Sequence, residues 1–109
     1  MHNVHMKVRT TAPDPDHGKS GFGFETTLTF TIVITSNGLE TTHPRALLAG
    51  IIAGFKALKR PSAVVINGAP QWLHGLLYKG YKVRKNADLV NTLNQIIEDN
   101  QHRLEEPHV

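Results

Sequence analysis

The chain has 109 residues, a formal net charge of +3 at pH 7 and no cysteine. This length suits one domain, and the lack of cysteine excludes a disulfide scaffold, thiolate metal sites and cysteine nucleophiles. No apolar run approaches the ~18 residues of a membrane helix, and the N-terminus lacks the apolar stretch of a signal peptide. We therefore expect one cytoplasmic domain over residues 1–109. Its positive charge is mild, so only clustered cations would point to an anionic partner.

The first third of the chain predicts three antiparallel strands. Apolar and polar side chains alternate over residues 4–10, which is the strand period. Residues 12–21 contain two prolines and two glycines and indicate a loop. Threonine, phenylalanine and isoleucine are frequent in residues 21–28 and 29–35, which predicts a hairpin. The Ser-Asn-Gly sequence at 36–38 should end the second of these strands.

The rest of the chain predicts helices around one further strand. A threonine cap followed by Pro44 starts a helix that runs from residue 41 to Pro61, with its apolar residues on one face. Residues 63–66 are apolar throughout and predict a strand covered on both faces, as parallel strands are. Shorter helices are expected over residues 70–79 and 86–100.

The end of the chain, residues 101–109, predicts either a short edge strand or a loose tail. Pro107 would confine any strand there to an edge of the sheet. The element order favours an α/β domain with a mixed sheet, in which three antiparallel strands are followed by a parallel strand and helices lie on its faces.

Four short motifs follow one another along the chain. They are Gly-Phe-Gly at 21–23, Thr-Thr-His-Pro-Arg-Ala-Leu-Leu-Ala at 41–49, Gln-Trp-Leu at 71–73 and Lys-Asn-Ala-Asp-Leu at 85–89. In this order and near this spacing they resemble motifs of the ribonuclease H family, over residues 4 to 104. The resemblance implies a ribonuclease H-like fold. In that family four acidic side chains hold two magnesium ions, which polarise the phosphate and activate water.

The chain departs from the family at the residues that carry this chemistry. The acidic positions fall at Thr10 or Thr11, at Leu47, at Ala69 and on a last helix before which the chain ends. His43 and Pro44 stand where the family has two asparagines that touch the hybrid's minor groove. The sequence therefore predicts a degenerate, truncated member with no catalytic residue, no resident metal and no cofactor.

Two groups of side chains could replace the lost ligands. Asp14, Asp16 and His17 lie within four residues, and His2 and His5 form a His-x-x-His pattern. The aspartates are more typical of a proline-rich turn that they cap themselves. The two histidines should point to different faces of a strand. We therefore predict no metal site in either group.

A basic and aromatic segment at 78–85 is the strongest candidate for binding. With a tryptophan just before it, its candidate residues are Trp72, Tyr78, Lys79, Tyr81, Lys82, Arg84 and Lys85. Aromatic side chains between cations suit base stacking and phosphate contact. The same pattern also fits a solvated connection whose tyrosines pack on the core, or a patch that faces a protein.

Small residues on the first helix form a second candidate surface. Ala46, Gly50 and Gly54 share one face, and each glycine costs about 1 kcal/mol in a helix. Tight packing on the sheet explains them, and self-association is the alternative. If residues 102–106 supply no fifth strand, residues 63–66 would also leave an apolar edge open to a partner.

These observations predict a non-catalytic binding protein, not an enzyme, that acts as a small regulator or inhibitor through protein–protein contact and could form a homodimer. One alternative is a nucleic-acid-binding module that uses residues 78–85 with weak, salt-sensitive affinity. Another is a compact metal-dependent nuclease with relocated ligands. No membrane partner is expected.

Overall fold

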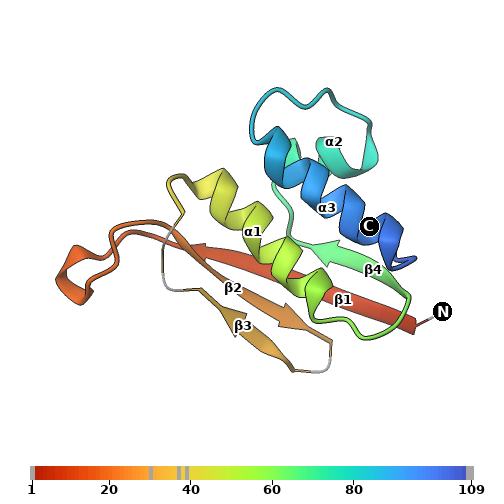
Figure 1. The fold of residues 1–109 in the computed structure, drawn as a ribbon, viewed down its shortest axis with the longest axis horizontal. Coiled ribbons are helices and arrows are strands. Elements are labelled where there is room, and N and C mark those ends of the chain that lie inside the picture. The colour runs from red at the N-terminus through yellow and green to blue at the C-terminus, as the bar shows by residue number, and fades with distance from the viewer. Residues whose placement is uncertain (1, 30, 37, 39, 108–109) are drawn as a thin grey trace.

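The computed structural model describes residues 2–29, 31–36, 38 and 40–107 (Figure 1). Its elements are β1 (His2–Thr11), the short 3-10 turn η1 (Pro15–His17), β2 (Gly23–Leu28), β3 (Val33–Thr35), α1 (His43–Lys56), β4 (Ser62–Asn67), α2 (Gln71–Tyr78), α3 (Ala87–Asp99) and β5 (Arg103–Glu105). Within these ranges no helix is long and apolar enough to cross a bilayer.

The strands form one mixed sheet in the order β3-β2-β1-β4-β5. β1 lies at its centre, antiparallel to β2 and parallel to β4. The parallel pair needs the α1 crossover, because a tight turn cannot return the chain in the same direction. The predicted mixed α/β sheet is confirmed. The second predicted strand of the hairpin is shorter than expected, and Phe30 and Asn37 of that region lie outside the described residues.

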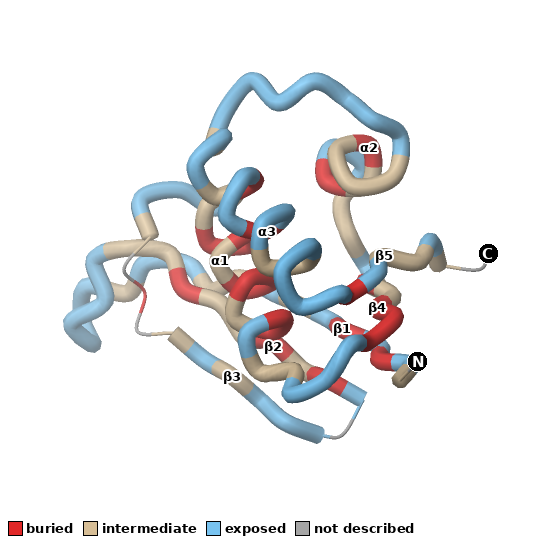
Figure 2. Tube along the Cα trace, turned by 45° about the vertical axis from the view of Figure 1, so that its right-hand side comes forward, coloured by how far each residue is buried: buried red, intermediate tan, exposed pale blue. Residues whose placement is uncertain are grey.

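Buried and exposed side chains alternate along β1, so one face of the sheet is covered and the other is open to solvent. Val4 and Met6 are almost fully buried, whereas Asn3, His5 and Lys7 are exposed. α1 lies across β1 and β2, and α3 packs against α1 (Figure 1). Figure 2 shows the buried residues concentrated between the helices and the strands. The apolar core therefore lies between the sheet and this helical layer.

The small residues of α1 face the sheet. A Cβ atom at Gly50 would meet Val8 and Phe24, and one at Gly54 would meet Met6. The hydroxyl of Thr26 on β2 donates a 2.8 Å hydrogen bond to the carbonyl oxygen of Gly50.

Ala46, on the same face, is also completely buried. The self-association face predicted for Ala46, Gly50 and Gly54 is therefore wrong, because the sheet already covers it.

The end of the chain supplies the fifth strand. β5 pairs with β4 in parallel, with Val64 opposite Leu104. The apolar edge predicted for residues 63–66 is therefore covered. With this edge and the α1 face both occupied, the homodimer loses the two surfaces from which it was predicted.

His102 fixes the start of β5 to the start of β4. Its imidazole is 8% exposed and lies 5.6 Å from the Phe55 ring, centre to centre. Its Nδ1 accepts a 3.1 Å hydrogen bond from the backbone N–H of Ser62, and its Nε2 has no partner among the described residues. Burial lowers the pKa of this imidazole, because the charged form is desolvated.

The close approach of α1 to the sheet predicts the effect of Gly50→Ala. Alanine is the better helix former, but the added methyl group overlaps the Val8 and Phe24 side chains. We expect the free energy of unfolding to fall by about 1–3 kcal/mol, as overpacked cores do. Urea unfolding of the wild type and the variant measures this. Gly54→Ala should lose less, since its nearest contact is the flexible end of Met6.

His102 should make stability depend on pH. Its pKa is lowered below 6.5 in the folded state, so the unfolded chain binds the proton more tightly. The contribution is complete above pH 6.5 and is lost as pH falls through the folded-state pKa. Urea unfolding between pH 5 and 8 should show this loss, and His102→Gln should flatten it. An equally steep loss in the variant would assign the effect to other groups.

Candidate functional site

A cavity of about 840 Å³ opens between the start of α1, α2 and the segment that joins α2 to α3. Its walls combine apolar, aromatic, amide and cationic side chains. They are Pro44, Leu48, Gln71, Trp72, Leu76, Tyr81, Lys82, Arg84, Lys85 and Asn86. The sequence therefore identified five of these residues as binding candidates, and the fold gathers them at one place.

Two aromatic rings on the cavity wall remain in contact with solvent. Trp72 is 39% exposed and Tyr81 is 57% exposed. The Tyr81 ring rests on Gly75 of α2, where a Cβ atom would overlap it, and the Tyr81 backbone N–H donates a 3.2 Å hydrogen bond to the carbonyl oxygen of Gly75. Gly75 is thus a positioning residue that the sequence pattern did not reveal.

The charge of the cavity is positive. Lys82, Arg84 and Lys85 are exposed, and none of the three forms an ion pair with another described residue. No described residue of the cavity lining is acidic. The three cations are consequently free to contact an anionic ligand.

The other two candidates of the basic segment point elsewhere. The Tyr78 hydroxyl donates a 3.0 Å hydrogen bond to the carbonyl oxygen of Glu105 in β5, and burial raises the pKa of Tyr78. Lys79 lies 3.5 Å from the Glu106 carboxylate. Tyr78 and Lys79 therefore attach α2 to the end of the chain and do not line the cavity.

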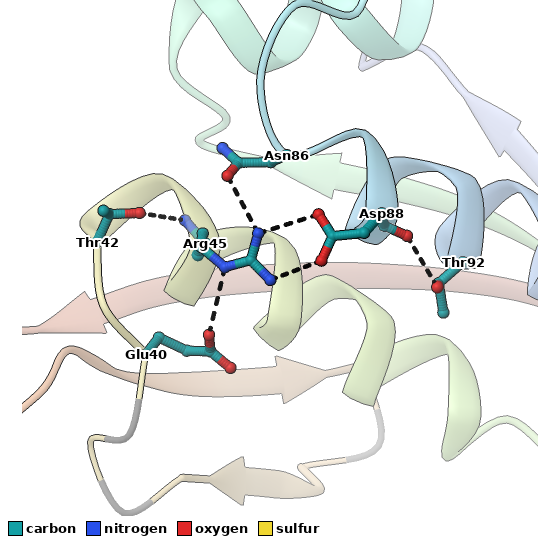
Figure 3. A network of polar contacts seen from close by, with 6 residues as sticks. All are labelled: Glu40, Thr42, Arg45, Asn86, Asp88 and Thr92. Atoms are coloured by element: carbon teal, nitrogen blue, oxygen red, sulfur yellow. Dashed lines mark hydrogen bonds and ion pairs between the residues drawn. The ribbon is translucent and has the colours of Figure 1, made fainter.

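A guanidinium group holds the two helices that flank the cavity (Figure 3). Arg45 on α1 donates two hydrogen bonds to the Asp88 carboxylate on α3, of 2.7 and 3.0 Å, and a third of 3.3 Å to Asn86 Oδ1. Its Nε lies 3.8 Å from Glu40. The Thr42 hydroxyl accepts the Arg45 backbone N–H and caps α1.

This arrangement explains two of the four sequence motifs, since the arginine of one contacts the Asn-x-Asp of the other. The hydrogen bonds from Arg45 lower the pKa of Asp88 to about 2 and raise that of Arg45. Asn86, the residue before α3, has a left-handed backbone with φ of 59°, a conformation that asparagine tolerates well.

The described positions where the family carries acidic ligands form no polar site in this structure. Leu47 is 5% exposed and belongs to the core, and Thr10, the last residue but one of β1, pairs with Phe24 of β2. Across the described ranges, no group of three histidine, aspartate or glutamate side chains could hold a metal ion. Asp14 instead pairs with His17 at 2.8 Å in the turn after β1. We assign no catalytic or metal-binding residue among the described residues.

The first two residues of α1 make different contacts. His43 packs edge-on against Phe22, with ring centres 6.4 Å apart, while Pro44 lines the cavity. The resemblance had drawn attention to these two positions only as lost asparagines.

The fold is that of ribonuclease H. The structure matches the N-terminal RNase H domain of a Mycobacterium tuberculosis protein, solved as a fusion with maltose-binding protein, with a TM-score of 0.69 and 14% identity over 98% of this chain and 83% of that one. It also matches LC11-RNase H1 in complex with an RNA/DNA hybrid, with a TM-score of 0.68 and 13% identity over 95% and 84% of the two chains.

Sequence relatives agree with this fold. The chain is 42% identical over 60 residues to a ribonuclease H of Syntrophotalea carbinolica, a match that covers 48% of this chain and 40% of that protein. It is 32% identical over 80 residues to a ribonuclease H of Verminephrobacter eiseniae, covering 62% and 52%. No protein-family model matches. The chain spans about half the length of the curated relatives it matches, and these comparisons support a ribonuclease H-like family.

These relatives correct the predicted function. The sequence predicted a non-catalytic regulator and not an enzyme, but the proteins that the chain matches are named ribonuclease H, which is an enzyme. The prediction rested on four single positions, whereas each match extends over 60 to 80 residues. Loss of the acidic residues at those positions was therefore given too much weight.

The Arg45–Asp88 pair predicts a measurable titration. Because the guanidinium favours the ionised carboxylate, the pKa of Asp88 should lie near 2, below its ordinary value of 3.8. In Arg45→Gln we expect it to return toward 3.8. Carbon-detected NMR of the aspartate carboxyl groups between pH 1.5 and 6 measures both values. A wild-type Asp88 that titrates near 3.8 would contradict the pairing.

Proposed function

We propose that this ribonuclease H-like protein acts on RNA–DNA hybrids and binds them through the cavity between the start of α1, α2 and the segment that joins α2 to α3. The observation that carries the proposal is a set of three exposed cations, Lys82, Arg84 and Lys85, that line an aromatic cavity and form no ion pair with another described residue. Phosphate groups are the ligand that such a rim attracts most strongly.

The comparisons support the choice of nucleic acid. The relatives are named ribonuclease H, and LC11-RNase H1 was solved in complex with an RNA/DNA hybrid. Because these proteins are named ribonuclease H, the reaction to assay is cleavage of the RNA strand. A cytoplasmic location belongs to the proposal, because the chain has no cysteine that an oxidising compartment would pair.

Contacts on either side of the cavity also favour a binding role. Arg45 and Asp88 join α1 to α3 on one side, and Tyr78 joins α2 to β5 on the other. The segment that carries the cations is thus held at both ends. A segment anchored at both ends loses less conformational entropy when a ligand binds than a free one does.

The proposal predicts that Lys82→Ala/Arg84→Ala/Lys85→Ala weakens binding of a blunt RNA–DNA hybrid. Each lost phosphate contact should reduce the magnitude of the slope of log affinity against log salt by about 0.9. The slope of the triple variant should therefore be smaller in magnitude by up to about 2–3. Fluorescence anisotropy at 50 to 200 mM salt measures affinity and slope, and cleavage of the RNA strand with Mg²⁺ is followed on the same samples.

The matched control removes the same number of charges elsewhere. Lys56 is exposed at the last residue of α1, about 18 Å from Pro44 along the helix, and Lys59 and Arg60 are exposed just after it. Lys56→Ala/Lys59→Ala/Arg60→Ala should keep most of the affinity. Equal losses in the two triple variants would show a response to net charge only and would remove the cavity from the proposal.

A further inference from the structure

We infer that the cavity holds one unstacked nucleobase from a single-stranded segment adjoining the hybrid. This inference rests on the proposed function and names the part of the nucleic acid that the cavity takes. The ligand is an unpaired base together with the phosphates on either side of it.

The aromatic rings select for an unstacked base. Trp72 and Tyr81 both line the cavity and remain 39% and 57% exposed. Inside a duplex both faces of each base are covered by its neighbours, so an internal base offers its face to a protein ring only when it is unstacked. Phosphate contacts alone would use the cations and leave the two rings without a function.

The polar groups of the cavity suit the rest of a nucleotide. Lys82, Arg84 and Lys85 supply charge for the backbone on either side of the base. Gln71 places an amide on the same wall, and an amide can both donate to and accept from the edge of a base.

The cavity is also built to keep its shape. Tyr81 rests on Gly75 and is tied to it by a backbone hydrogen bond, so its ring is in place before a ligand binds. Its volume of about 840 Å³ is in the range of small-molecule sites, ample for a nucleotide. Acidic groups, which would repel a nucleotide, are absent from the described lining.

Four ligands test the inference. They are a blunt RNA–DNA hybrid, the same hybrid with a three-nucleotide DNA overhang, the same with an RNA overhang, and the same with a three-nucleotide abasic overhang. The abasic overhang carries the phosphates without the bases. Anisotropy gives each Kd, and the fluorescence of Trp72 reports directly on the cavity because it is the only tryptophan in the chain.

We expect an overhang with bases to bind at least about fivefold more tightly than the abasic overhang, as the stacking of one base predicts. It should also quench Trp72, and the two base-bearing arms show whether DNA or RNA is preferred. In Trp72→Ala the affinity ratio should fall to about one, whereas Trp72→Phe should retain most of it. Lys56→Ala/Lys59→Ala/Arg60→Ala should leave the ratio unchanged, and Gly75→Ala, which displaces the Tyr81 ring, should lower it.

The outcomes separate this inference from the proposed function. Equal affinity for base-bearing and abasic overhangs, with tight binding of the blunt hybrid, overturns the base site and leaves hybrid binding intact. Binding of a hybrid with a base-bearing overhang, without binding of the blunt hybrid, overturns the proposed function alone. Failure to bind any of the four ligands overturns both.

Discussion

The pairing of Arg45 with Asp88 is the interaction on which the candidate site depends. A planar guanidinium with two parallel hydrogen bonds to a carboxylate fixes orientation as well as distance, which a lysine cannot do. Here it sets the start of α3 against the start of α1, and the cavity lies beside that junction. Both partners are partly open to solvent, so the pair matters more for geometry than for stability.

Local patterns in the sequence were sufficient for most of the fold. The alternation in β1, the threonine cap of α1 and the apolar run of β4 each have a short-range cause that can be read residue by residue. No such short-range pattern in the sequence predicts β5. It is three residues long, and only its pairing with β4 and the burial of His102 make it a strand. Those contacts link residues far apart in the sequence, so the pattern left its structure open.

The sequence predicted most of the aromatic and basic residues of the candidate site, but not that the basic segment would divide between two surfaces. The basic segment was treated as one surface, yet Tyr78 and Lys79 face β5 and only Tyr81 and the residues after it reach the cavity. Gly80, with φ of 69°, lies at the turn between the two directions. A glycine in a sequence marks a turn without giving its direction. Gly75 and Arg45 were missed for a related reason, since each acts through a partner on another element.

The position of β1 has a consequence for the order in which the chain folds. It is synthesised before the other described strands but lies at the centre of the sheet, so its edge toward β4 has no partner until Ser62 has been made. At translation rates of roughly 5–20 residues per second, the interval between Thr11 and Ser62 lasts about 3–10 s. During that time β1 can pair with β2 and receive α1, while its other edge stays open to neighbouring nascent chains.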